Sequence, residues 1–412
     1  MAPPSSSSST DEFGMQTLTL TLIPGLPNDL GALILAFVPY SHQSRLKSIC
    51  KSWRRFFSSR ALISLRQTYV VPPQLLCIFR QDPSISSPYL FDPRNQSWCP
   101  LPPMPCNPHV YGLSNFISVS VGPHLYVLGG SLFDTRSFPL DRPSPSSSAY
   151  RFDFSTFTWD SLSPMITARG SFACAAAPEW GKIVVAGGGS RHAMFGAAGS
   201  RMSSVEMYDI VKDEWVALDG LPRFRAGCVG FFMGTEFWVM GGYGESRTVS
   251  GVFPVDEYYK DAVAMELKNG GKWRELGDMW EDGGRRKLGK IVVVEDVYWD
   301  ASPGIFMLDR SEIFRYDRSC NRWEKETSMP RKASDDGSVG FVGIDGELHL
   351  FILVNSSEPA EGRRSRSHNK RSATLLIQIY DPRKRSWRSV MAKPPFHQPI
   401  DFRTAVMSTI RL

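Results

Sequence analysis

The sequence has no paired cysteines, because its seven cysteine residues stand singly and without a CxxC motif. This pattern argues against a disulfide framework and a zinc site, and it is typical of reduced thiols in a cytoplasmic or nuclear protein. HExxH and GxSxG motifs are also missing, and the seven histidines are isolated. We therefore expect no metal, no cofactor and no catalytic residues, and predict that the protein is not an enzyme.

Long hydrophobic runs and an early positive charge are missing too. The first 23 residues contain no Lys or Arg, and the apolar stretch near Leu18–Val38 is interrupted by Pro24, Pro27, Asn28 and Asp29. A signal peptide begins with a basic region, and a membrane helix needs about 20 apolar residues in a row. We expect neither, and we expect no membrane partner.

A broad basic surface is not indicated either. The net charge of the chain is +6, but residues 24–66 alone carry +6 and residues 361–371 carry +4, so the rest of the chain carries −4. A protein that follows a nucleic-acid backbone needs an extended basic face. The sequence therefore predicts no nucleic-acid partner.

Glycine, proline and phenylalanine are abundant, with 34, 30 and 25 residues, and 42% of the 412 residues are hydrophobic. Such a composition supports a large core with many turns. We divide the chain into residues 1–23, whose Ser/Pro-rich start predicts disorder, residues 24–66 and residues 67–412.

Residues 24–66 have the pattern of two or three short helices. A first apolar stripe at helical spacing is formed by Leu30, Leu33, Ile34 and Phe37. A second stripe is formed by Leu46, Ile49, Cys50 and Trp53. So short a segment buries too little apolar surface for robust stability on its own, so it needs a partner or the neighbouring domain.

A repeat begins after residue 66. In five segments an Asp stands six residues before a Trp, namely Asp92/Trp98, Asp153/Trp159, Asp209/Trp215, Asp317/Trp323 and Asp381/Trp387. In a sixth segment Glu266 stands seven residues before Trp273. The Trp residues are about 58 residues apart on average, which is too long a period for WD40 repeats. We interpret these aromatic and acidic positions as structural, packing one repeat against the next.

Further apolar runs precede each Trp. Strands that end in a Gly pair are predicted at residues 124–130, 182–189 and 236–242, and their equivalents without the pair at residues 297–299 and 348–354. Another run follows an Arg in three places, at Arg169, Arg225 and Arg403. Each repeat therefore predicts four antiparallel strands.

Four-stranded sheets become stable when their faces pack radially as the blades of a propeller. The 346 residues that follow residue 66 accommodate six units of about 58 residues. The predicted fold is mainly β, a six-bladed β-propeller preceded by a small α-helical domain. The Arg-led run near the chain end has no Trp unit after it, so we expect this C-terminal strand to close the first blade.

These motifs resemble two known families. The order of Gly pair, Tyr-x-Asp and Trp at this period resembles the kelch repeat. Residues 24–66 resemble the F-box through Leu26, Pro27, Asp29, Leu30, Ile34, Leu35, Pro39, Ile49, Cys50, Lys51, Trp53 and Arg54. Together the two resemblances cover nearly all of residues 24–412, and the chain looks like a plant-type F-box/kelch-repeat protein.

The resemblance implies a substrate-recognition subunit of an SCF-type E3 ubiquitin ligase. Its F-box would bind a Skp1-like adaptor and through it a cullin, and its kelch propeller would bind a protein target for ubiquitination and degradation, in the cytoplasm, the nucleus or both. Two alternatives remain open: a non-degradative kelch interaction scaffold, and a kelch-type enzyme of the oxidase or specifier kind.

The expected adaptor-binding residues are the apolar and motif positions of the F-box: Leu26, Pro27, Leu30, Ile34, Leu35, Val38, Pro39, Leu46, Ile49, Cys50 and Trp53. Several buried Leu or Ile anchors at about 1.5–3 kcal/mol each would support a durable complex. Leu33, Phe37 and Ile49 suit a small helical core equally well.

The expected substrate-binding residues lie on the long connections between second and third strands, and on the segments that lead into each first strand. Long loops on a rigid scaffold usually carry recognition, and Arg and aromatic residues dominate interface energies. The candidates are Arg136, Arg169, Arg191, His192, Phe195, Arg225, Tyr243, Arg247 and Tyr258.

Two further motifs are weaker. Residues 284–290 match a phosphate-binding loop only in part, because Ile291 stands where Ser or Thr would bind Mg²⁺ and a strand follows instead of a helix. The basic run 363–371 fits a solvated loop between two strands better than a nuclear import signal.

Overall fold

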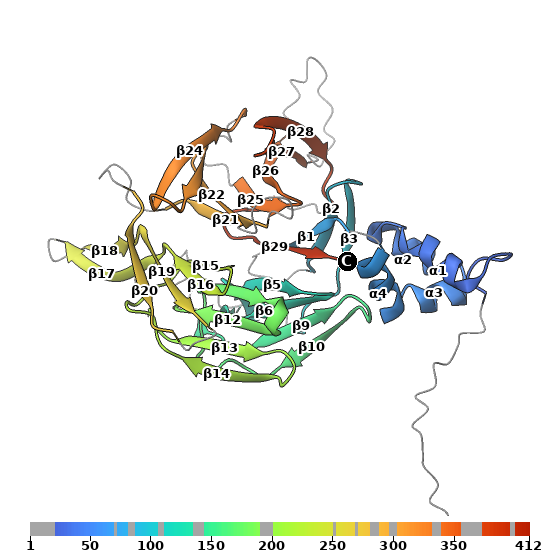
Figure 1. Cartoon of the computed structure of the whole chain (residues 1–412), viewed down its shortest axis with the longest axis horizontal. Helices are drawn as coiled ribbons and strands as arrows, with labels where there is room; N and C mark the ends of the chain where they lie inside the picture. The colour runs from blue at the N-terminus through green and yellow to red at the C-terminus, as the bar shows by residue number, and fades with distance from the viewer. Residues whose placement is uncertain are drawn as a thin grey trace, which may run out of the picture. The chain divides into compact units, whose positions relative to one another are not determined.

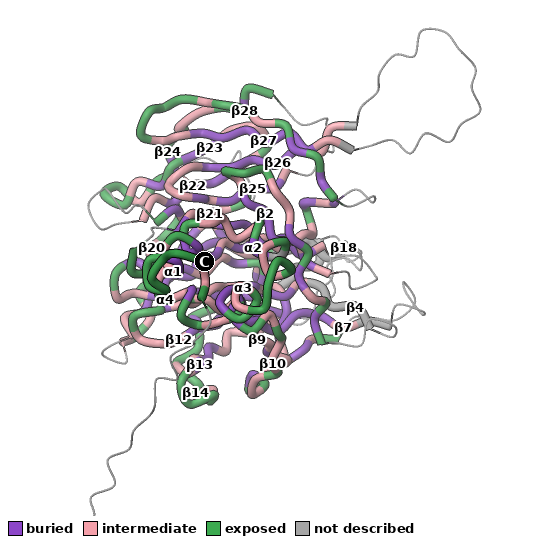
Figure 2. Tube along the Cα trace, turned by 90° about the vertical axis from the view of Figure 1, so that its right-hand side faces the viewer, coloured by how far each residue is buried: buried purple, intermediate pink, exposed green. Residues whose placement is uncertain are grey.

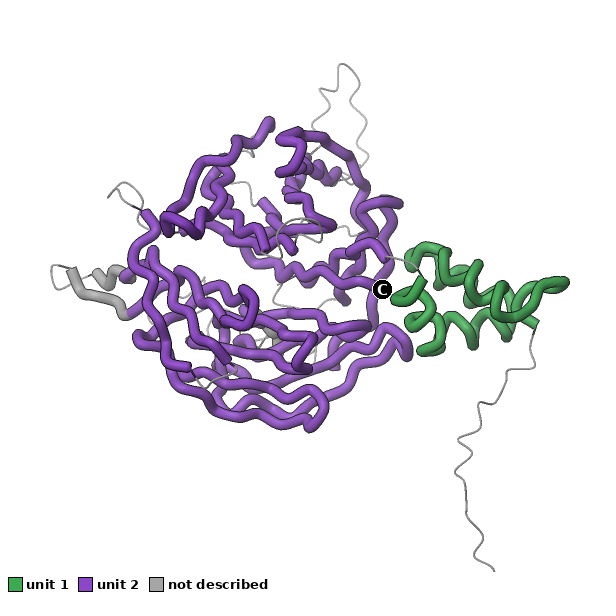
Figure 3. The backbone as a smooth tube through the Cα atoms, in the orientation of Figure 1, with its two compact units in different colours: residues 1–71 green, residues 72–412 purple. Residues whose placement is uncertain are grey.

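The computed structural model describes residues 21–69, 72–80, 87–105, 111–134, 144–189, 201–249, 253–267, 271–280, 288–295, 303–331, 339–355, 373–395 and 400–412. The chain divides into two compact units, residues 1–71 and residues 72–412 (Figure 3). Each unit is described by itself. Among the described residues, no helix is both long and apolar enough to cross a membrane.

The first unit contains four helices, and they continue beyond residue 66. They are α1 (Asn28–Ala36), α2 (Tyr40–Leu46), α3 (Lys51–Phe56) and α4 (Arg60–Tyr69). Proline residues fix the starts of the first two helices, because Pro27 and Pro39 occupy their N-cap positions. The first turn of α1 carries Asp29, whose negative charge is favourable at a helix N-terminus.

A small core holds these helices together. It consists of Leu35, Ala36, Phe56, Phe57 and Leu62, all at most 5% exposed. The indole Nε1 of Trp53 donates a hydrogen bond of 2.6 Å to the carbonyl of Leu22, which ties the segment before α1 to α3. With five buried apolar residues in this core among the residues that the structure describes, the unit has little core of its own.

The second unit is a six-bladed propeller of four-stranded antiparallel sheets arranged around a common axis (Figure 1). Blade one contains β29 (Val406–Arg411), β1 (Gln74–Phe79), β2 (Tyr89–Asp92) and β3 (Ser97–Pro100). Blade two contains β5 (Ile117–Val121), β6 (His124–Leu128), β9 (Ala149–Asp153) and β10 (Thr158–Leu162). Blade three contains β11 (Ala173–Ala177), β12 (Lys182–Ala186), β13 (Val205–Asp209) and β14 (Glu214–Leu218).

The other three blades have the same order of strands. Blade four contains β15 (Val229–Met233), β16 (Glu236–Met240), β19 (Asp261–Glu266) and β20 (Arg274–Asp278). Blade five contains β21 (Lys290–Val294), β22 (Gly304–Asp309), β23 (Glu312–Asp317) and β24 (Arg322–Ser328). Blade six contains β25 (Val339–Ile344), β26 (Glu347–Asn355), β27 (Ala373–Asp381) and β28 (Ser386–Ala392).

Extra strands lie in the connections of blades two and four. A three-stranded sheet is formed by β4 (Tyr111–Ser114), β7 (Ser131–Asp134) and β8 (Ser144–Pro145). A hairpin is formed by β17 (Tyr243–Val249) and β18 (Phe253–Tyr258). Part of the long connections that the sequence treated as loops is therefore regular β structure.

The second strand of blade five differs from the prediction. The sequence pattern placed it at residues 297–299, which lie outside the described residues, whereas the structure forms it from Gly304–Asp309. A two-residue turn, Arg310 and Ser311, then leads directly into β23. Both segments are apolar and favour strands, so local propensity could not choose between them.

The C-terminal strand β29 lies in blade one, where six residue pairs join it to β1, from Gln74↔Arg411 to Phe79↔Val406. Asp345, in the turn between β25 and β26, reaches this junction from blade six. Its carboxylate accepts hydrogen bonds from the backbone N–H of Gln74, from Arg411 at 2.9 Å and from Arg94 at 3.1 Å. Strand pairing and side-chain contacts together join the last blade to the first.

The repeated Asp and Trp residues shape the turn and the packing between the third and fourth strands. In five blades the Asp carboxylate accepts hydrogen bonds from backbone N–H groups two or three residues later, at Asp92, Asp153, Asp209, Asp317 and Asp381. The following Trp packs on the aromatic residue before the Asp, as Trp215 does on Tyr208 at 4.9 Å between ring centroids. The Trp215 indole N–H also donates to the Ser163 carbonyl of the preceding blade. These residues pack blades together, as predicted.

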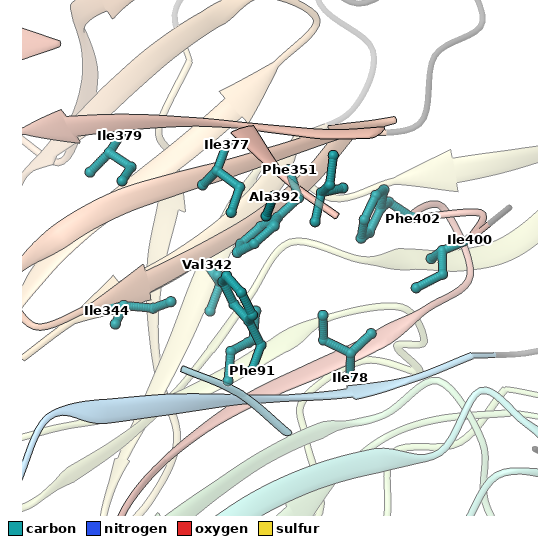
Figure 4. Close-up of a cluster of buried hydrophobic side chains, with 12 residues drawn as sticks. Ile78, Phe91, Val342, Ile344, Phe351, Ile377, Ile379, Ala392, Ile400 and Phe402 are labelled. Atoms are coloured by element: carbon teal, nitrogen blue, oxygen red, sulfur yellow. The ribbon is translucent and has the colours of Figure 1, made fainter. Parts of the chain in front are cut away.

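The core lies between neighbouring blades. In Figure 4, Phe91 of blade one contacts Phe351 of blade six, next to Phe402 from the segment before β29. Second strands such as β12 and β16 are almost wholly buried, whereas the outer strands β14 and β28 are largely exposed (Figure 2).

Candidate protein-binding surfaces

Helix α1 exposes an apolar stripe. Leu30, Ile34 and Phe37 follow one another at i, i+4 and i+7, and their exposed fractions are 49%, 51% and 59%. Leu26 just before the helix and Ile49 before α3 are also exposed, at 37% and 61%. Large side chains of this kind rarely gather on the surface of a small unit unless another molecule covers them. We call these five residues the α1 stripe.

The structure separates the predicted adaptor-binding residues into three groups. Leu26, Pro27, Leu30, Ile34, Ile49 and Cys50 are exposed. Val38, Pro39, Leu46 and Trp53 are half-buried. Leu35 is 3% exposed and belongs to the helical core, so its side chain supports α1 rather than facing solvent. Phe37, which the sequence could equally assign to the core, lies on the surface.

Cys50 has a local structural role. Its Sγ accepts a hydrogen bond of 3.4 Å from the backbone N–H of Trp53 and contacts the Ser52 hydroxyl, and so it caps α3. These two groups lower the pKa of the Cys50 thiol from its ordinary value, with the Ser52 hydroxyl making the larger contribution. The position is exposed and therefore still open to a partner.

The helical unit is basic around the α1 stripe. Exposed bases occupy α2, α3 and the start of α4, at Arg45, Lys51, Arg54, Arg55 and Arg60. Asp29 is the one acidic residue between residues 24 and 66. A partner that covers the stripe therefore meets positive charge at its edge, which favours an acidic rim on that partner.

On the propeller, Arg169 is not a substrate-binding residue, because its side chain is fully buried. Its guanidinium donates to the carbonyls of Gly187 and Ser204, at 2.8 and 2.9 Å, and forms an ion pair with Glu206 on β13. Burial lowers the pKa of Arg169 from its ordinary value, and the Glu206 carboxylate opposes that shift. The prediction of a substrate contact at Arg169 is therefore wrong. The sequence could not show that a buried acid lies beside this arginine.

Arg225 repeats this arrangement one blade later, with 1% of its side chain exposed. It donates to the Gly241 carbonyl at 2.9 Å and to the Asp261 carboxylate at 2.8 Å. The prediction of a substrate contact at Arg225 is wrong for the same reason. Both arginines instead bond to the first glycine of a Gly pair and to an acid on the third strand of the same blade.

The main chain of each buried arginine also reaches the preceding blade. The N–H of Gly130 donates to the Arg169 carbonyl and the N–H of Gly188 to the Arg225 carbonyl, both at 2.8 Å. All six glycines of the three pairs have a positive φ. A Cβ on Gly187 would overlap the Arg225 carbonyl oxygen, so the pair allows a close approach that other residues would block. We call this repeated contact the Gly–Arg link.

Of the other predicted substrate-binding residues, Tyr243 and Tyr258 are half-buried, and their rings lie 6.2 Å apart. The Arg201 guanidinium lies 5.2 Å from the Tyr243 ring centroid, which is cation–π distance. For Arg247 the structure describes only the backbone, in β17. Arg136, Arg191, His192 and Phe195 lie outside the described residues.

Two exposed apolar residues on this face were missed. Ile166 and Phe224, with exposed fractions of 61% and 47%, lie in the segments that lead into blades three and four. Phe224 stands between Arg223, which pairs with Asp261 and Glu275, and the buried Arg225. The Arg-Phe-Arg sequence was the available signal, because an aromatic residue between two arginines is typical of contact surfaces.

One acidic group has ligand atoms close enough for a metal ion among the described residues. It consists of Asp317, Cys320 and Glu324, whose ligand atoms lie within 4.8 Å of one another. Asp317 already accepts hydrogen bonds from the backbone and hydroxyl of Ser319, both at 2.7 Å. The group is part of an Asp turn that recurs in four other blades, and we assign it no metal.

Comparisons with known proteins agree with both parts of the chain. An F-box domain profile matches residues 23–65, and a kelch motif profile matches residues 113–166 and 181–222. The chain is 59% identical to the F-box/kelch-repeat protein OR23 of Arabidopsis thaliana over 96% of this chain and 92% of that protein. It is 28% identical to the Arabidopsis F-box/kelch-repeat protein SKIP20, over 82% and 83% of the two chains. The chain belongs to the F-box/kelch-repeat proteins.

Proposed function

We propose that this protein is the substrate-recognition subunit of an SCF-type ubiquitin ligase. Its helical unit binds a Skp1-like adaptor and through it a cullin, and its propeller binds the protein that is to be ubiquitinated. The chain adds no catalytic group of its own. It increases the rate of ubiquitin transfer by holding the target close to the charged conjugating enzyme, so that transfer becomes effectively intramolecular.

The observation that carries this proposal is the α1 stripe. Five large apolar side chains lie exposed in the region that matches the F-box, on a unit whose described residues place five apolar side chains in its buried core. Covering them contributes about 1.5–3 kcal/mol for each residue fully buried, which is enough to outweigh the cost of association. A Skp1-like adaptor is the occupant that the family implies.

The substrate face of the propeller is proposed on weaker grounds. Ile166, Phe224, Tyr243 and Tyr258 lie on the connections that carry the extra hairpin and the segments leading into blades three and four. They combine exposed apolar and aromatic surface with nearby arginines, which suits a protein epitope. Arg169 and Arg225 are not part of this face and instead fix the backbone beneath it.

The test is a pull-down with purified full-length protein, a recombinant Skp1-like adaptor and a cullin. Leu30→Asp with Ile34→Asp places two charges in the α1 stripe at exposed positions, so the fold should be preserved. We expect adaptor binding to weaken by at least about a hundredfold, because both anchors are lost and charge is buried. Val211→Asp with Met391→Asp is the matched control, since both residues are exposed apolar residues of the propeller.

Failure of the wild-type chain to bind the adaptor, or equal binding by the stripe variant and the control, would contradict the proposal. Binding of the adaptor without recruitment of the cullin would favour a non-degradative scaffold. The substrate face is tested separately by Phe224→Asp, which should reduce target capture without changing adaptor binding.

A further inference from the structure

A cleft lies between blades five and six, on the side of the propeller opposite the proposed substrate face. It has a volume of about 880 Å³, within the size range of ligand sites. Its walls come from the Asp turns of both blades and from the turn between β25 and β26, at Gly346. In an antiparallel blade these turns emerge at the end away from the connection between second and third strands.

The lining of the cleft is rich in arginine. Five bases line it, Arg315, Arg318, Lys325, Arg383 and Arg385, together with three acids, Asp317, Glu324 and Glu326. The bases come from both walls, because the first three belong to blade five and the last two to the Asp turn of blade six. Positive charge therefore faces the space from two sides.

Two of the acids are already engaged. The Glu326 carboxylate accepts a hydrogen bond of 2.7 Å from the Tyr380 hydroxyl, and Asp317 accepts from Ser319 within its own turn. Lys325 is also engaged, in an ion pair of 2.7 Å with Glu312. Neither hydrogen bond removes the charge of its carboxylate, so the lining carries five bases against three acids, and the charge of Lys325 is offset by Glu312.

Arg315 and Arg385 differ from these residues, because their side chains are not engaged by other groups of the cleft that the structure describes. Both are exposed, and neither forms a hydrogen bond or an ion pair through its side chain within the described part of the chain. Glu324 lies directly across from Arg315 in the pairing of β23 with β24, yet no ion pair joins them. The cleft thus offers two guanidinium groups whose planar donors match carboxylates in a bidentate geometry.

We propose that this cleft binds an acidic peptide segment, one with several Asp or Glu residues close together, from a partner protein. Bases spread over both walls suit a chain of several carboxylates better than a single anion. The site is distinct from the α1 stripe and from the proposed substrate face. It gives the propeller a second recognition site that does not depend on assembly with an adaptor.

The test measures fluorescence anisotropy of a short labelled peptide rich in Asp and Glu, titrated with purified full-length protein. The same peptide with Asn and Gln in place of the acids is the neutral reference. We expect saturable binding of the acidic peptide that weakens as salt is raised, and no binding of the neutral one. Failure of the acidic peptide to bind, or equal binding of the two peptides, overturns the proposal.

Variants locate the binding in the cleft. Arg315→Gln with Arg385→Gln should weaken binding by about tenfold or more, because both charge-assisted contacts are lost. Gln suits the backbone at residue 385, since Gln96 occupies the same position of the Asp turn in blade one with the same φ of 49°. Lys212→Gln with Lys272→Gln is the matched control, because it removes two exposed charges from blades three and four.

A variant that should strengthen binding of the acidic peptide, rather than weaken it, gives a further test. Glu324→Gln removes the acid that lies opposite Arg315, so it should tighten binding of the acidic peptide several-fold. A thermal melt of each variant checks that the propeller is intact. If the double arginine variant binds as tightly as the lysine control, the cleft is not the site.

Discussion

Blades three and four and blades five and six use the same four strands but are fixed to their neighbours in different ways. In blades three and four, the side chain of a buried arginine bonds to the Gly pair and to an acid of its own blade, and its carbonyl forms the Gly–Arg link to the preceding blade. Blades five and six lack the Gly pair. Blade five has a two-residue turn after its second strand, and blade six has two strands of nine residues each.

The difference shows what the Gly pair is for. In blades two to four, the chain leaves the second strand sharply at the Gly pair, and glycine there allows both the positive φ and the close approach of other main-chain or side-chain atoms. Where the strand turns straight back, as at Arg310 and Ser311, neither requirement applies. The kelch profile matches within blades two and three, which both have a Gly pair, and it matches neither blade four, which also has one, nor blades five and six.

The largest expected effect comes from breaking blade one, which has no Gly pair and depends on β29. Deletion of residues 400–412 removes four residues that are at most 4% exposed, Ile400, Phe402, Ile410 and Leu412. Their burial contributes roughly 6–12 kcal/mol, which is comparable with the whole stability of a domain. We expect loss of the cooperative unfolding transition in circular dichroism.

The control for this deletion is a chain without residues 1–20, which should unfold like the full-length protein. A chain without residues 400–412 that melts at the full-length temperature would show that the ring does not need β29.

The next largest effect is the loss of stability when a buried arginine is replaced, compared with the loss when an exposed arginine is replaced. Arg169→Met leaves the Glu206 carboxylate buried without its partner, which typically costs about 3–5 kcal/mol. Arg403 begins the corresponding run before β29, but it forms an ion pair with Asp401 two residues away and 67% of its side chain is exposed. Arg403→Met should cost less than about 1 kcal/mol. Urea unfolding of the two variants measures the difference, and equal costs would mean that the buried ion pair between Arg169 and Glu206 adds no stability.

A third prediction compares two reasons why a glycine is needed: a positive φ alone, and a positive φ together with a close contact to another backbone segment. Gly187 and Gly234 have nearly the same positive φ, 66° and 60°, but only Gly187 lies against another backbone segment, at Arg225. Gly234→Ala should lower the free energy of unfolding by about 1–2 kcal/mol, the usual cost of a left-handed conformation for a residue with a side chain. Gly187→Ala should cost about 2–4 kcal/mol, because the new methyl group also pushes the neighbouring blade away. Similar unfolding free energies for the two variants would contradict this account of the Gly pair.

The smallest effect concerns an ion pair of blade six. Burial alone would raise the pKa of Glu347, but the His349 imidazole 3.7 Å away and the Arg388 guanidinium that donates to its carboxylate lower that pKa to about 2. Because this pKa lies below the ordinary value of 4.5, the stabilisation is present above about pH 4.5 and is lost as the pH falls toward 2. Glu347→Gln should therefore lose less stability than the wild type over that range.

The measurement is the urea midpoint of both proteins at several pH values between 5 and 2. Asp401→Asn, which breaks a mainly exposed pair, is the control and should follow the wild type. Parallel curves for the wild type and Glu347→Gln would show that this ion pair does not contribute.

Local patterns in the sequence were enough to predict six blades and a helical unit. The Asp and Trp positions could be predicted because the turn that requires them lies within seven residues. The role of Arg169 could not, since its partner Glu206 is 37 residues away and comes close only in the folded sheet. The same holds for Arg225 and Asp261, 36 residues apart.

Surface positions were harder to predict than core positions. The helical period placed Leu30, Leu33, Ile34 and Phe37 on one face, but it could not show that Phe37 faces solvent. The motif that placed Leu35 among the adaptor-binding residues could not show that its side chain faces inward. That division depends on where α3 and α4 pack, which no local pattern records. The cleft between blades five and six was missed because its arginines come from two repeats that approach only when the ring forms.

The pairing of β29 with β1 also sets an order of events during synthesis. The ribosome makes β1 early, and β29 emerges only after every other strand that the structure describes. Until then the first blade has an open edge, which can pair with other chains. The helices of the first unit, by contrast, are complete before the first strand is made. A nascent chain can therefore display its α1 stripe well before its propeller is able to recognise anything.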